Sequence, residues 1–462
     1  MRGQPKHRES APGWPAFPAK PTLPGLLDGL KVSQWWPAAE IAQAQRAQLA
    51  WLVGWAAAQV PHFERSEWAR PAANDLAAAV KALDPARFDT LWRELPLLTK
   101  PELRRVGPRL NARTVPPDQT PLETLRTSGS TGIAVEVRST PATRALWEAL
   151  TIREHLWSRR DFMRRMGAIR FRNRNARATD GQIQPTWGLP VAQLFRSGPS
   201  SAMHIGKPLE ELADWLLRFD PHYLLTYPSI MGPLMDTVAV SGGRPPALEE
   251  VRFISEPLDP ELQARLTADW QVRSTDLYSA NEVGYIAFRC REHGALHVQS
   301  ESLLVEVLAD DGRPCTPGET GRVVVTSLHN LATPLLRYEI GDFAEVGLPC
   351  PCGRGLAVLA RVQGRVRNLV RTPDGRRYWP VALGRLRDIK PIIQAQFVQT
   401  ALDTVELRAV LSRPLERAEI VDALACTRLA LGYPFEVTLV PVAEIPRGPT
   451  GKFEEFLSLL DG

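Results

Sequence analysis

Between residues 140 and 278 the sequence alternates between stretches with apolar residues at helical spacing and short apolar stretches typical of strands. Helices are predicted over residues 140–166, 209–218, 228–240 and 260–270, and strands over 167–171, 222–226, 251–255 and 275–278. Alternation of this kind predicts α/β layers with largely parallel strands. No other feature restricts the fold as strongly, and the predicted fold class is α/β.

The segments outside this alternation have other patterns. Residues 1–33 are rich in proline and are expected to be disordered or extended. Helices are predicted over 37–60, over 71–94 and after Thr99, which can act as an N-cap. Between 296 and 346, Asp311-Gly312 and Pro317-Gly318 interrupt short β-rich segments, which predicts hairpins.

The length of 462 residues exceeds what one hydrophobic core usually supports, so at least two domains are expected. We predict a large N-terminal domain over 34–363, with mixed sheets and a β-rich part at about 285–360. A small α+β domain is predicted over 364–462, with strands near 393–398, 405–411 and 435–440.

The composition, with 44% hydrophobic and 23% charged residues, is that of a soluble globular protein. No apolar run is long enough to cross a bilayer, and the N-terminal segment lacks a secretory pattern, so a cytoplasmic location is expected. The net charge of +5 is a small excess, concentrated in nine arginines from Arg153 to Arg177. That stretch is interpreted as a solvated helix face, and the alternative is a basic approach to a polyanion such as a nucleotide or coenzyme A.

A polar glycine-rich stretch, Thr127-Ser128-Gly129-Ser130-Thr131-Gly132, precedes the strand-like residues 133–137. Because these residues lack bulk, several backbone N–H groups can point into one concavity, and four hydroxyls add hydrogen-bonding groups suited to phosphate. No lysine follows the second glycine and no helical pattern begins there, so the stretch is not a Walker A loop. An ordinary surface turn is the alternative interpretation.

Four further motifs follow this loop. They are Ile254-Ser255-Glu256-Pro257, DLYSANEVG at 276–284, RYEIGD at 337–342 followed by Gly364-Arg365, and IPRGPTGK at 445–452. Together with the loop, these motifs resemble those of the adenylate-forming enzymes, the superfamily of acyl-CoA synthetases, luciferases and peptide-synthetase adenylation domains. Within it the chain looks most like the phenylacetate-CoA ligase branch. The resemblance covers most of the chain, from LPLLTK at 95–100 to the final motif.

The resemblance implies a site for ATP. The 127–132 loop would hold the β- and γ-phosphates, and Ser255, Glu256 and Pro257 would line the adenine pocket. The ring of Tyr278 would stack on the base, beside Ser279 and Asn281, because a flat apolar face suits a purine. Asp342, a carboxylate that only accepts hydrogen bonds, would bind the ribose hydroxyls.

The resemblance also implies catalytic roles. Glu282 would help hold Mg²⁺, Thr131 would act on the phosphates, and Arg365 would contact the nucleotide beside the domain joint. Lys452 would bridge the substrate carboxylate and the α-phosphate. Taken singly, each residue has an ordinary alternative: strand-end caps for Asp342 and Glu282, a core aromatic for Tyr278 and a solvated charge for Lys452.

The reaction implied is attack of a carboxylate on the α-phosphorus, with release of pyrophosphate and formation of an acyl adenylate. The small C-terminal domain is mobile in the family, and it would then rotate so that a thiol, normally that of coenzyme A, attacks the adenylate. Three positions depart from the family pattern: Ser279 replaces Gly, Asn281 replaces Thr or Ser, and Arg367-Asn368 replaces an acidic hinge pair. Transfer to a carrier protein or an amine is therefore kept as an alternative.

The five cysteines form an odd set in a long chain without an export signal, which argues against a disulfide framework. Cys290 and His293 form one close pair and Cys350 and Cys352 another, so four ligands can close a tetrahedron around a structural Zn²⁺. Some members of the resembling branch carry such a cluster. The alternative is a set of reduced, partly buried thiols, as expected for Cys315 and Cys426, which have no such partners.

The predicted acid substrate is aromatic, because residues 223–230, Ser279-Ala280 and Trp187-Gly188 offer aromatic and small side chains for a pocket. Expected partners are this acid, ATP and coenzyme A, with a carrier protein as an option and neither nucleic acid nor membrane. Dimers are common in the resembling branch, so a homodimer is a further option. An alternative of another class is a non-catalytic zinc protein that binds nucleic acid through the arginine-rich stretch.

Overall fold

A computed structural model describes residues 22–126, 136–172, 177–240, 243–365, 369–378, 389–447 and 453–460, together with Pro380 and Leu386. The glycine-rich loop at 127–132, the pair Arg367-Asn368 and Lys452 lie outside the described residues. Among the described helices, none has both the length and the apolar character needed to cross a bilayer. The chain divides into two compact units.

The first unit comprises residues 1–160, 279–340 and 345–361. Its helices are α1 (Leu23–Ser33), α2 (Ala38–Gln59), α3 (Pro61–Glu64), α4 (Ala69–Lys81), α5 (Pro85–Glu94), α6 (Lys100–Val106), α7 (Pro141–Trp157) and the 3₁₀ turns η1 (Gly107–Leu110) and η2 (Pro117–Gln119). Its strands are β1 (Glu123–Arg126), β2 (Glu136–Ser139), β8 (Gly284–Arg289), β9 (Leu296–Val298), β10 (Leu303–Leu308), β11 (Thr320–Ser327), and most of β12 (Tyr338–Val346) and β13 (Val358–Arg365).

Six of these strands lie in the order β10-β11-β12-β13-β9-β8, and β10 with β11, β13 with β9, and β8 with β9 pair antiparallel. Buried glutamines attach α2 to the segments between these strands. The Gln45 side-chain amide donates to the carbonyl of Ser300 at 2.8 Å, and that of Gln48 to the carbonyl of Leu328 at 2.9 Å. Each buried amide thereby satisfies a loop carbonyl that no strand partner reaches.

The prediction that residues 1–33 are disordered or extended was wrong for 23–33, which form α1. The Thr22 side chain accepts a hydrogen bond from the Gly25 N–H, and Leu23, Leu26, Leu27 and Leu30 are buried. These leucines recur at helical spacing, and α1 contacts α7. Two glycines lower the intrinsic helix propensity of this segment, and packing of the leucine face outweighs that cost.

Two predicted helices have different bounds. The segment 71–94 contains two helices, because Leu83 adopts a left-handed φ of 52° and the Asp84 side chain caps α5 by accepting from the Arg87 N–H. The helix predicted over 140–166 ends at Trp157, and Arg159 has a φ of 52°. Thr99 caps α6 as predicted.

The second unit comprises residues 161–278, 341–344 and 362–462. Its first part contains β3 (Met166–Arg170), α9 (Val191–Leu194), β4 (Ser200–His204), α10 (Leu209–Phe219), β5 (Tyr223–Thr226), α11 (Pro228–Val240), β6 (Glu250–Phe253), α12 (Pro260–Arg265), the π-helical turn η3 (Leu266–Trp270) and most of β7 (Arg273–Ala280). The strands lie in the order β7-β6-β5-β3-β4 and all pair parallel, which confirms the predicted α/β alternation.

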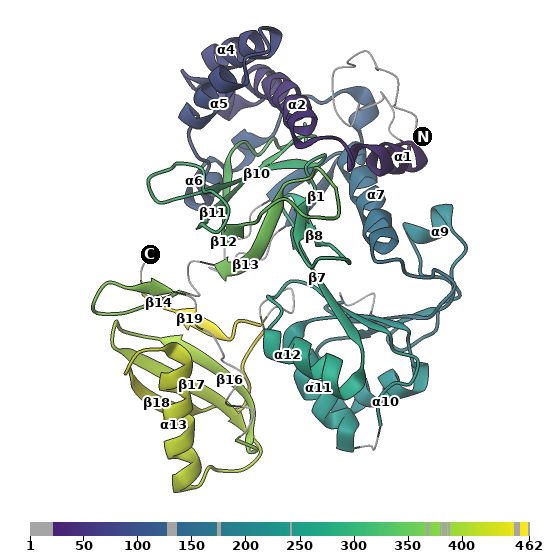
Figure 1. Cartoon of the computed structure of the whole chain (residues 1–462), viewed down its shortest axis with the longest axis vertical. Coiled ribbons are helices and arrows are strands. Elements are labelled where there is room, and N and C mark those ends of the chain that lie inside the picture. The colour runs from purple at the N-terminus through teal and green to yellow at the C-terminus, as the bar shows by residue number, and fades with distance from the viewer. Residues whose placement is uncertain are drawn as a thin grey trace. The chain divides into compact units, whose positions relative to one another are not determined.

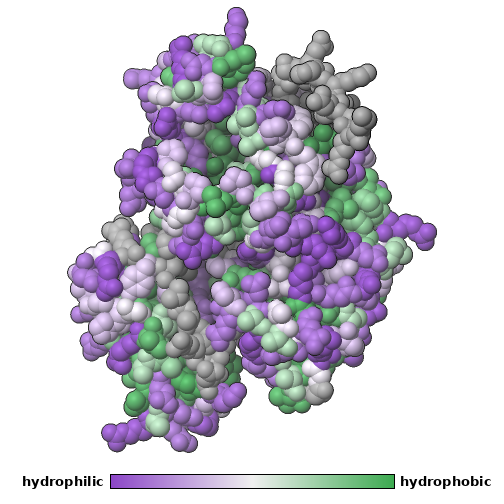
Figure 2. Space-filling model, viewed as in Figure 1, coloured by the Kyte–Doolittle hydropathy of each residue, from purple (hydrophilic) through white to green (hydrophobic). Residues whose placement is uncertain are grey.

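Helices α10, α11 and α12 cover this parallel sheet (Figure 1). The core between them is formed by side chains such as Leu216, Leu224, Leu234, Val251 and Phe253, none more than 2% exposed. Burial of such side chains contributes about 1.5–3 kcal/mol each. Hydrophilic residues predominate on the visible surface over these helices (Figure 2), as expected when their apolar faces point inward.

The rest of the second unit contains β14 (Val370–Arg371), β15 (Arg377–Tyr378), β16 (Ile392–Gln399), β17 (Thr404–Leu411), α13 (Arg417–Leu431), β18 (Glu436–Pro441) and β19 (Phe456–Ser458). The last four strands form a sheet in the order β18-β17-β16-β19, against which α13 packs (Figure 1). The three strands predicted here are present. The predicted domain boundary between 363 and 364 stays a prediction.

Candidate functional site

Two predicted site segments lie at one edge of the parallel sheet. Strands β6 and β7 are neighbours, with Phe253 opposite Asp276, so Ser255-Glu256-Pro257 and Tyr278 lie at the carboxyl ends of adjacent parallel strands. In open α/β sheets ligands bind at this edge. Ser255 is exposed and has a left-handed φ of 69°, a costly conformation for serine that turns the chain sharply after β6.

The structure brings together Tyr278 and Asp342, which are 64 residues apart in the sequence. The Tyr278 hydroxyl donates to Asp342 Oδ2 at 2.8 Å, and both residues are half-buried. Gly341 precedes Asp342 with a φ of 82°, a conformation that glycine adopts without strain. A half-buried ring and a carboxylate side by side can contact an aromatic base and a pair of hydroxyl groups.

Glu256 has partners that the sequence did not indicate. Its Oε2 accepts from the Ser229 N–H at 3.0 Å and its Oε1 from the Phe453 N–H at 2.7 Å. The Arg447 guanidinium lies 3.6 Å from Oε1 and donates to Ser229 Oγ at 2.9 Å. The Glu256 side chain is 6% exposed, so its carboxylate binds protein groups and only its backbone remains for the predicted adenine pocket.

The structure describes four more of the predicted nucleotide-binding residues. Glu282, in the first unit, is half-buried and accepts from the Tyr338 hydroxyl at 3.5 Å, while Asn281 beside it is exposed. Ser279 is half-buried in β7, and Arg365 ends β13. The loop Thr127–Gly132 and Lys452 lie outside the described residues, so their roles stay predictions.

The aromatic residues predicted to line an acid pocket have packing roles. The Trp187 ring lies edge-to-face against Phe162 and Tyr223, with centroids 5.3 and 5.8 Å apart, and its indole N–H donates to the Arg164 carbonyl at 2.7 Å. The Tyr227 hydroxyl accepts from the Phe171 N–H at 3.3 Å, and burial raises its pKa. These rings fix the loop that follows β3.

Four potential metal ligands converge in the first unit. Ligand atoms of Cys290, His297, Cys350 and Cys352 all lie within 4.8 Å of one another, and His297 Nε2 is 3.3 Å from Cys352 Sγ. Cys290 directly follows β8, and His297 lies in β9, opposite Phe288 of β8 and Val358 of β13. The other two cysteines lie in the loop between β12 and β13. We name these four residues the sulfur cluster.

The histidine beside the three thiols is His297 and not the predicted His293. His293 is exposed in the turn that joins β8 to β9, whereas His297 is fully buried. The short Cys-x-x-His spacing favoured His293, but that turn carries it away from the thiols. A signal for His297 was available, since it is the polar member of the apolar strand Leu296-His297-Val298.

Burial is the largest cause of the pKa shifts of His297 and Cys350 in the cluster. It lowers the pKa of His297 to about 4, with Arg354 and Arg153 acting in the same direction, and raises the pKa of Cys350 to about 12. Burial acts to raise the pKa of Cys352 also, but hydrogen bonds from the Arg354 backbone and side chain lower it overall. Arg354 is thus a cationic neighbour that favours a thiolate.

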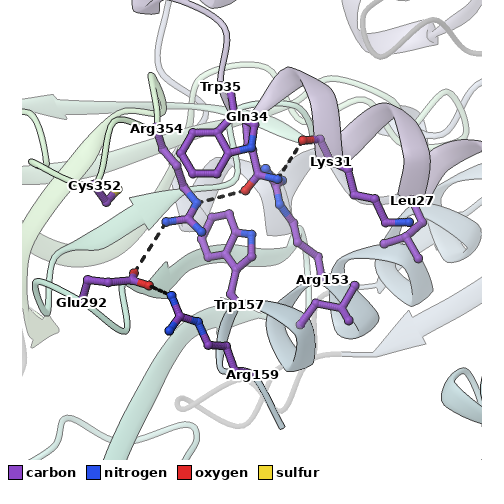
Figure 3. A pocket seen from close by; sticks show the side chains of 11 residues that line it. Leu27, Lys31, Gln34, Trp35, Arg153, Trp157, Arg159, Glu292, Cys352 and Arg354 are labelled. Carbon is purple, nitrogen blue, oxygen red and sulfur yellow. Dashed lines mark hydrogen bonds and ion pairs between the residues drawn. The ribbon is translucent and has the colours of Figure 1, made fainter. Parts of the chain in front are cut away.

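Arg354 lies between two aromatic rings beside the sulfur cluster (Figure 3). Its Cζ is 4.8 Å from the Trp35 centroid and 4.3 Å from that of Trp157, and its Nε donates to Gln34 Oε1 at 2.9 Å. It lines a cavity of about 340 Å³ together with Cys352. This packing fixes the guanidinium next to the thiols.

The interpretation of the arginine-rich stretch as a solvated helix face was wrong. Arg153 and Arg160 are only 2% and 5% exposed. Six of the arginines pair with carboxylates: Arg153 with Glu301, Arg159 with Glu292, Arg160 with Glu154, Arg164 with Glu249, Arg165 with Asp220 and Arg172 with Asp180. Their charge is largely matched within the protein, which removes the basis for a polyanion-binding helix face.

The fold is shared with CoA ligases whose solved structures contain acyl adenylates. The chain matches a 2-hydroxyisobutyryl-CoA ligase, solved in the postadenylation state with R3-HIB-AMP, with a TM-score of 0.68 and 20% identity over 92% of this chain and 90% of that chain. It matches the anthranilate CoA ligase AuaEII with anthranoyl-AMP at a TM-score of 0.51 and 17% identity, over 71% of this chain and 65% of that one.

At the level of sequence the chain is similar to a phenylacetate-coenzyme A ligase from Thermus thermophilus. The two are 27% identical over 272 residues, covering 52% of this chain and 61% of the relative, so the match spans less than two thirds of that relative's length. No family model matches the chain. The similarity and the shared fold confirm the resemblance that the ordered motifs indicated.

Proposed function

We propose that this protein activates a carboxylic acid with ATP, releases pyrophosphate, and transfers the acyl group from the acyl adenylate to the thiol of coenzyme A. The observation that carries the proposal is the Tyr278–Asp342 contact at the carboxyl edge of the parallel sheet, because the ordered motifs assign these two residues to one nucleotide. The similarity to CoA ligases supports the same reaction.

In this proposal the nucleotide is held by groups with matching chemistry. Tyr278 stacks on adenine, and Asp342, which accepts from the Tyr278 hydroxyl, is the proposed acceptor for the ribose hydroxyls. The backbone of residues 255–257 lines the base, with Ser279 and Asn281 beside it, and the 127–132 loop binds the phosphates. Arg365 contacts the nucleotide near the end of β13.

The adenylation step needs orientation and charge neutralisation more than covalent chemistry. The acid's carboxylate attacks the α-phosphorus, and pyrophosphate leaves with the electron pair of the broken P–O bond. Lys452 neutralises the charge that accumulates on the carboxylate and the α-phosphate, and Thr131 orients the leaving phosphates. Glu282 is the proposed ligand for Mg²⁺, which would neutralise the leaving pyrophosphate.

An aryl acid is proposed as the substrate, and the similarity to a phenylacetate-coenzyme A ligase supports this choice. The test is a panel of phenylacetate, benzoate and 2-hydroxyisobutyrate, with acid-dependent pyrophosphate release measured with and without coenzyme A. We expect the aryl acids to give the faster release and a CoA thioester as product. If pyrophosphate is released but acyl transfer occurs only when a carrier protein or an amine is added, that molecule and not coenzyme A is the acceptor. Absence of acid-dependent pyrophosphate release would overturn the proposed function.

We also propose that the sulfur cluster binds a structural Zn²⁺. Three thiols and an imidazole form a closed donor set, and Zn–S bonds of about 2.3 Å place ligand atoms roughly 3.8 Å apart, within the 4.8 Å limit that the cluster satisfies. Three thiolates around Zn²⁺ leave one negative charge, which Arg354 offsets. His297 Nε2 lies 3.3 Å from Cys352 Sγ, so this nitrogen is the one proposed to coordinate the metal. Elemental analysis is expected to find one zinc per chain, and its absence from protein purified without chelators would contradict the site.

A further inference from the structure

One member of the sulfur cluster lies at a cavity, and the other three are enclosed by protein. Cys290, His297 and Cys350 are 2%, 0% and 7% exposed, whereas Cys352 is half-buried. Among these four residues Cys352 is the one that lines the cavity of about 340 Å³ (Figure 3). A reagent that enters the cavity therefore meets the Cys352 thiol before it meets the other two.

The cavity can admit a small organic reagent. It is formed within the first unit by residues at the ends of α1 and α7, in the turn between β8 and β9 and in the loop that carries Cys352. Trp35 and Arg159 in its lining are 51% and 68% exposed, so the cavity can be reached from solvent. A protein cavity of about 150 Å³ can bind benzene, so the larger volume here suffices for a reagent with a short chain of heavy atoms.

Basic side chains predominate among the lining residues that the structure describes. Four of these residues are basic and one is acidic: Lys31, Arg153, Arg159 and Arg354 against Glu292. The Glu292 carboxylate is shared, because it lies 2.7 Å from the Arg159 guanidinium and 4.0 Å from that of Arg354. A cleft lined by an excess of one sign of charge raises the local concentration of ions of the opposite sign. The lining therefore favours anionic reagents over cationic reagents of the same size.

Arg354 is the fixed part of this positive charge. It follows Cys352 by two residues in the same loop, and it is packed between the Trp35 and Trp157 rings (Figure 3). A fixed cation close to the sulfur attracts the anionic group of a reagent toward the position from which it can react. Arg159 is exposed at the edge of the cavity, so its charge can be changed while the packing of Arg354 is kept.

We infer that Cys352 is a modification site, at which small anionic disulfides that enter through the cavity thiolate the sulfur cluster. The Cys352 thiolate attacks one sulfur of the disulfide and forms a new S–S bond. The other half of the reagent leaves as a thiolate with the electron pair of the broken S–S bond. A modified Cys352 no longer offers a thiolate to a metal, so three ligands of the proposed zinc site remain. The inference rests on the proposed zinc site for this last effect alone.

The test uses two methanethiosulfonate probes of similar size on the purified full-length protein. One probe, MTSES, carries a sulfonate group, and the other, MTSET, carries a trimethylammonium group. Each transfers its thioalkyl group to a thiolate and releases methanesulfinate. The rate at each cysteine is measured by peptide mass spectrometry, and released zinc is measured with a chromogenic chelator. Cys426, which lies outside the cluster, is the internal reference.

At low salt the MTSES-to-MTSET rate ratio at Cys352 should exceed the same ratio at Cys426 by at least about tenfold. The preference should shrink at high salt, because exposed charges are then screened. Cys352 should react before Cys290 and Cys350, and zinc should leave at the rate at which Cys352 is modified. Equal ratios at Cys352 and Cys426, earlier reaction of an enclosed cysteine, or zinc that stays bound after modification would overturn the inference.

Arg159→Glu tests the charge at the edge of the cavity and keeps all four cluster residues. It should lower the preference of Cys352 for the anionic probe at least about fivefold. Arg105→Glu is the matched control, because Arg105 is 67% exposed and pairs with Glu102 but does not line the cavity. A preference that falls equally in both variants, or in neither, would contradict the role assigned to the cavity.

Failure of the zinc site and failure of this inference give different results. Protein purified without zinc that is still modified first at Cys352, with the anionic probe preferred, contradicts the zinc proposal and supports the modification site. Zinc-loaded protein in which Cys352 resists both probes supports the zinc proposal and overturns the modification site. Neither measurement depends on the activity of the protein toward an acid or ATP.

Discussion

The sulfur cluster and the strand-end residues Glu256, Tyr278 and Asp342 show two ways in which one chain collects polar side chains. The residues of the cluster come from the position directly after β8, from β9 and from the loop before β13, and three of the four are less than 9% exposed. Glu256 follows β6, Tyr278 lies near the end of β7 and Asp342 lies in β12, and Tyr278 and Asp342 remain half-buried. A closed donor set suits a structural ion, whereas partly open groups suit a ligand that enters and leaves.

The largest effect is expected at the sulfur cluster. Cys350→Ser should abolish stoichiometric zinc and lower the Tm more than any other substitution proposed here, because structural zinc contributes on the order of 10 kcal/mol in small zinc modules. Zinc content and thermal unfolding are the measurements. Cys426→Ser, at a cysteine outside the cluster, is the control and should keep both values. Full zinc content in the first variant would show that the cluster is not the metal site.

The next largest effect distinguishes the proposed active site from the sulfur cluster, because it changes catalysis and leaves the zinc content unchanged. Lys452→Ala should reduce pyrophosphate–ATP exchange by about 10²- to 10³-fold, the usual cost of removing a group that stabilises transition-state charge. Zinc content and Tm should stay at wild-type values, because the proposed role of Lys452 is in adenylation and not in metal binding. Lys390→Ala, at an exposed lysine, is the control. Exchange within about threefold of wild type would refute the catalytic role of the lysine.

A smaller effect is expected on nucleotide binding. Asp342→Asn should weaken ATP binding by about 10- to 100-fold, since hydrogen bonds to a charged group contribute about 1.5–3 kcal/mol. Tyr278→Phe keeps the ring and removes only the hydroxyl bonded to Asp342, so its loss should be less than about tenfold. Calorimetric ATP affinity tests both. If Tyr278→Phe weakened binding more than Asp342→Asn, the assigned roles would be inverted.

The smallest effect concerns pH and the buried polar groups of the first unit. Burial lowers the pKa of His329 to about 3, and its Nε2 lies 2.7 Å from the Glu301 carbonyl. Below pH 6.5 His329 is protonated in the unfolded chain but stays neutral in the folded protein. The free energy of unfolding should therefore fall as the pH drops from 6.5 toward 3. The slope is at most about 1.4 kcal/mol per pH unit.

Urea unfolding at pH 7 and pH 5 checks this dependence. Between these values His329 should cost wild type up to about 2 kcal/mol of unfolding free energy. His329→Asn should lose that part of the pH dependence while starting from a lower stability at pH 7. Identical pH dependence in the two proteins would exclude His329 as its source.

Local sequence patterns predicted most of the fold because they report interactions between near neighbours. The helices over 38–59 and 209–219, the cap at Thr99 and the parallel strands β5, β6 and β7 follow from periodicity and capping. The segment 23–33 was missed because its helix depends on leucines that pack against α7, which propensity does not report. The arginines of 153–177 were wrongly interpreted as solvated because several of them pair with carboxylates far away in the sequence, which a local charge pattern does not report.

The linear order of residues encodes the α/β alternation, the succession of motifs and the residue types of the proposed ATP, Mg²⁺ and zinc sites. Tertiary structure alone decided that His297 and not His293 joins the thiols, because antiparallel pairing of β9 with β8 and β13 sets which side chain faces them. It also decided that Glu256 binds Arg447 and the Phe453 amide. These contacts depend on strand register and on the connections between strands, which bring together atoms that are far apart in the sequence. A local sequence pattern therefore does not predict them.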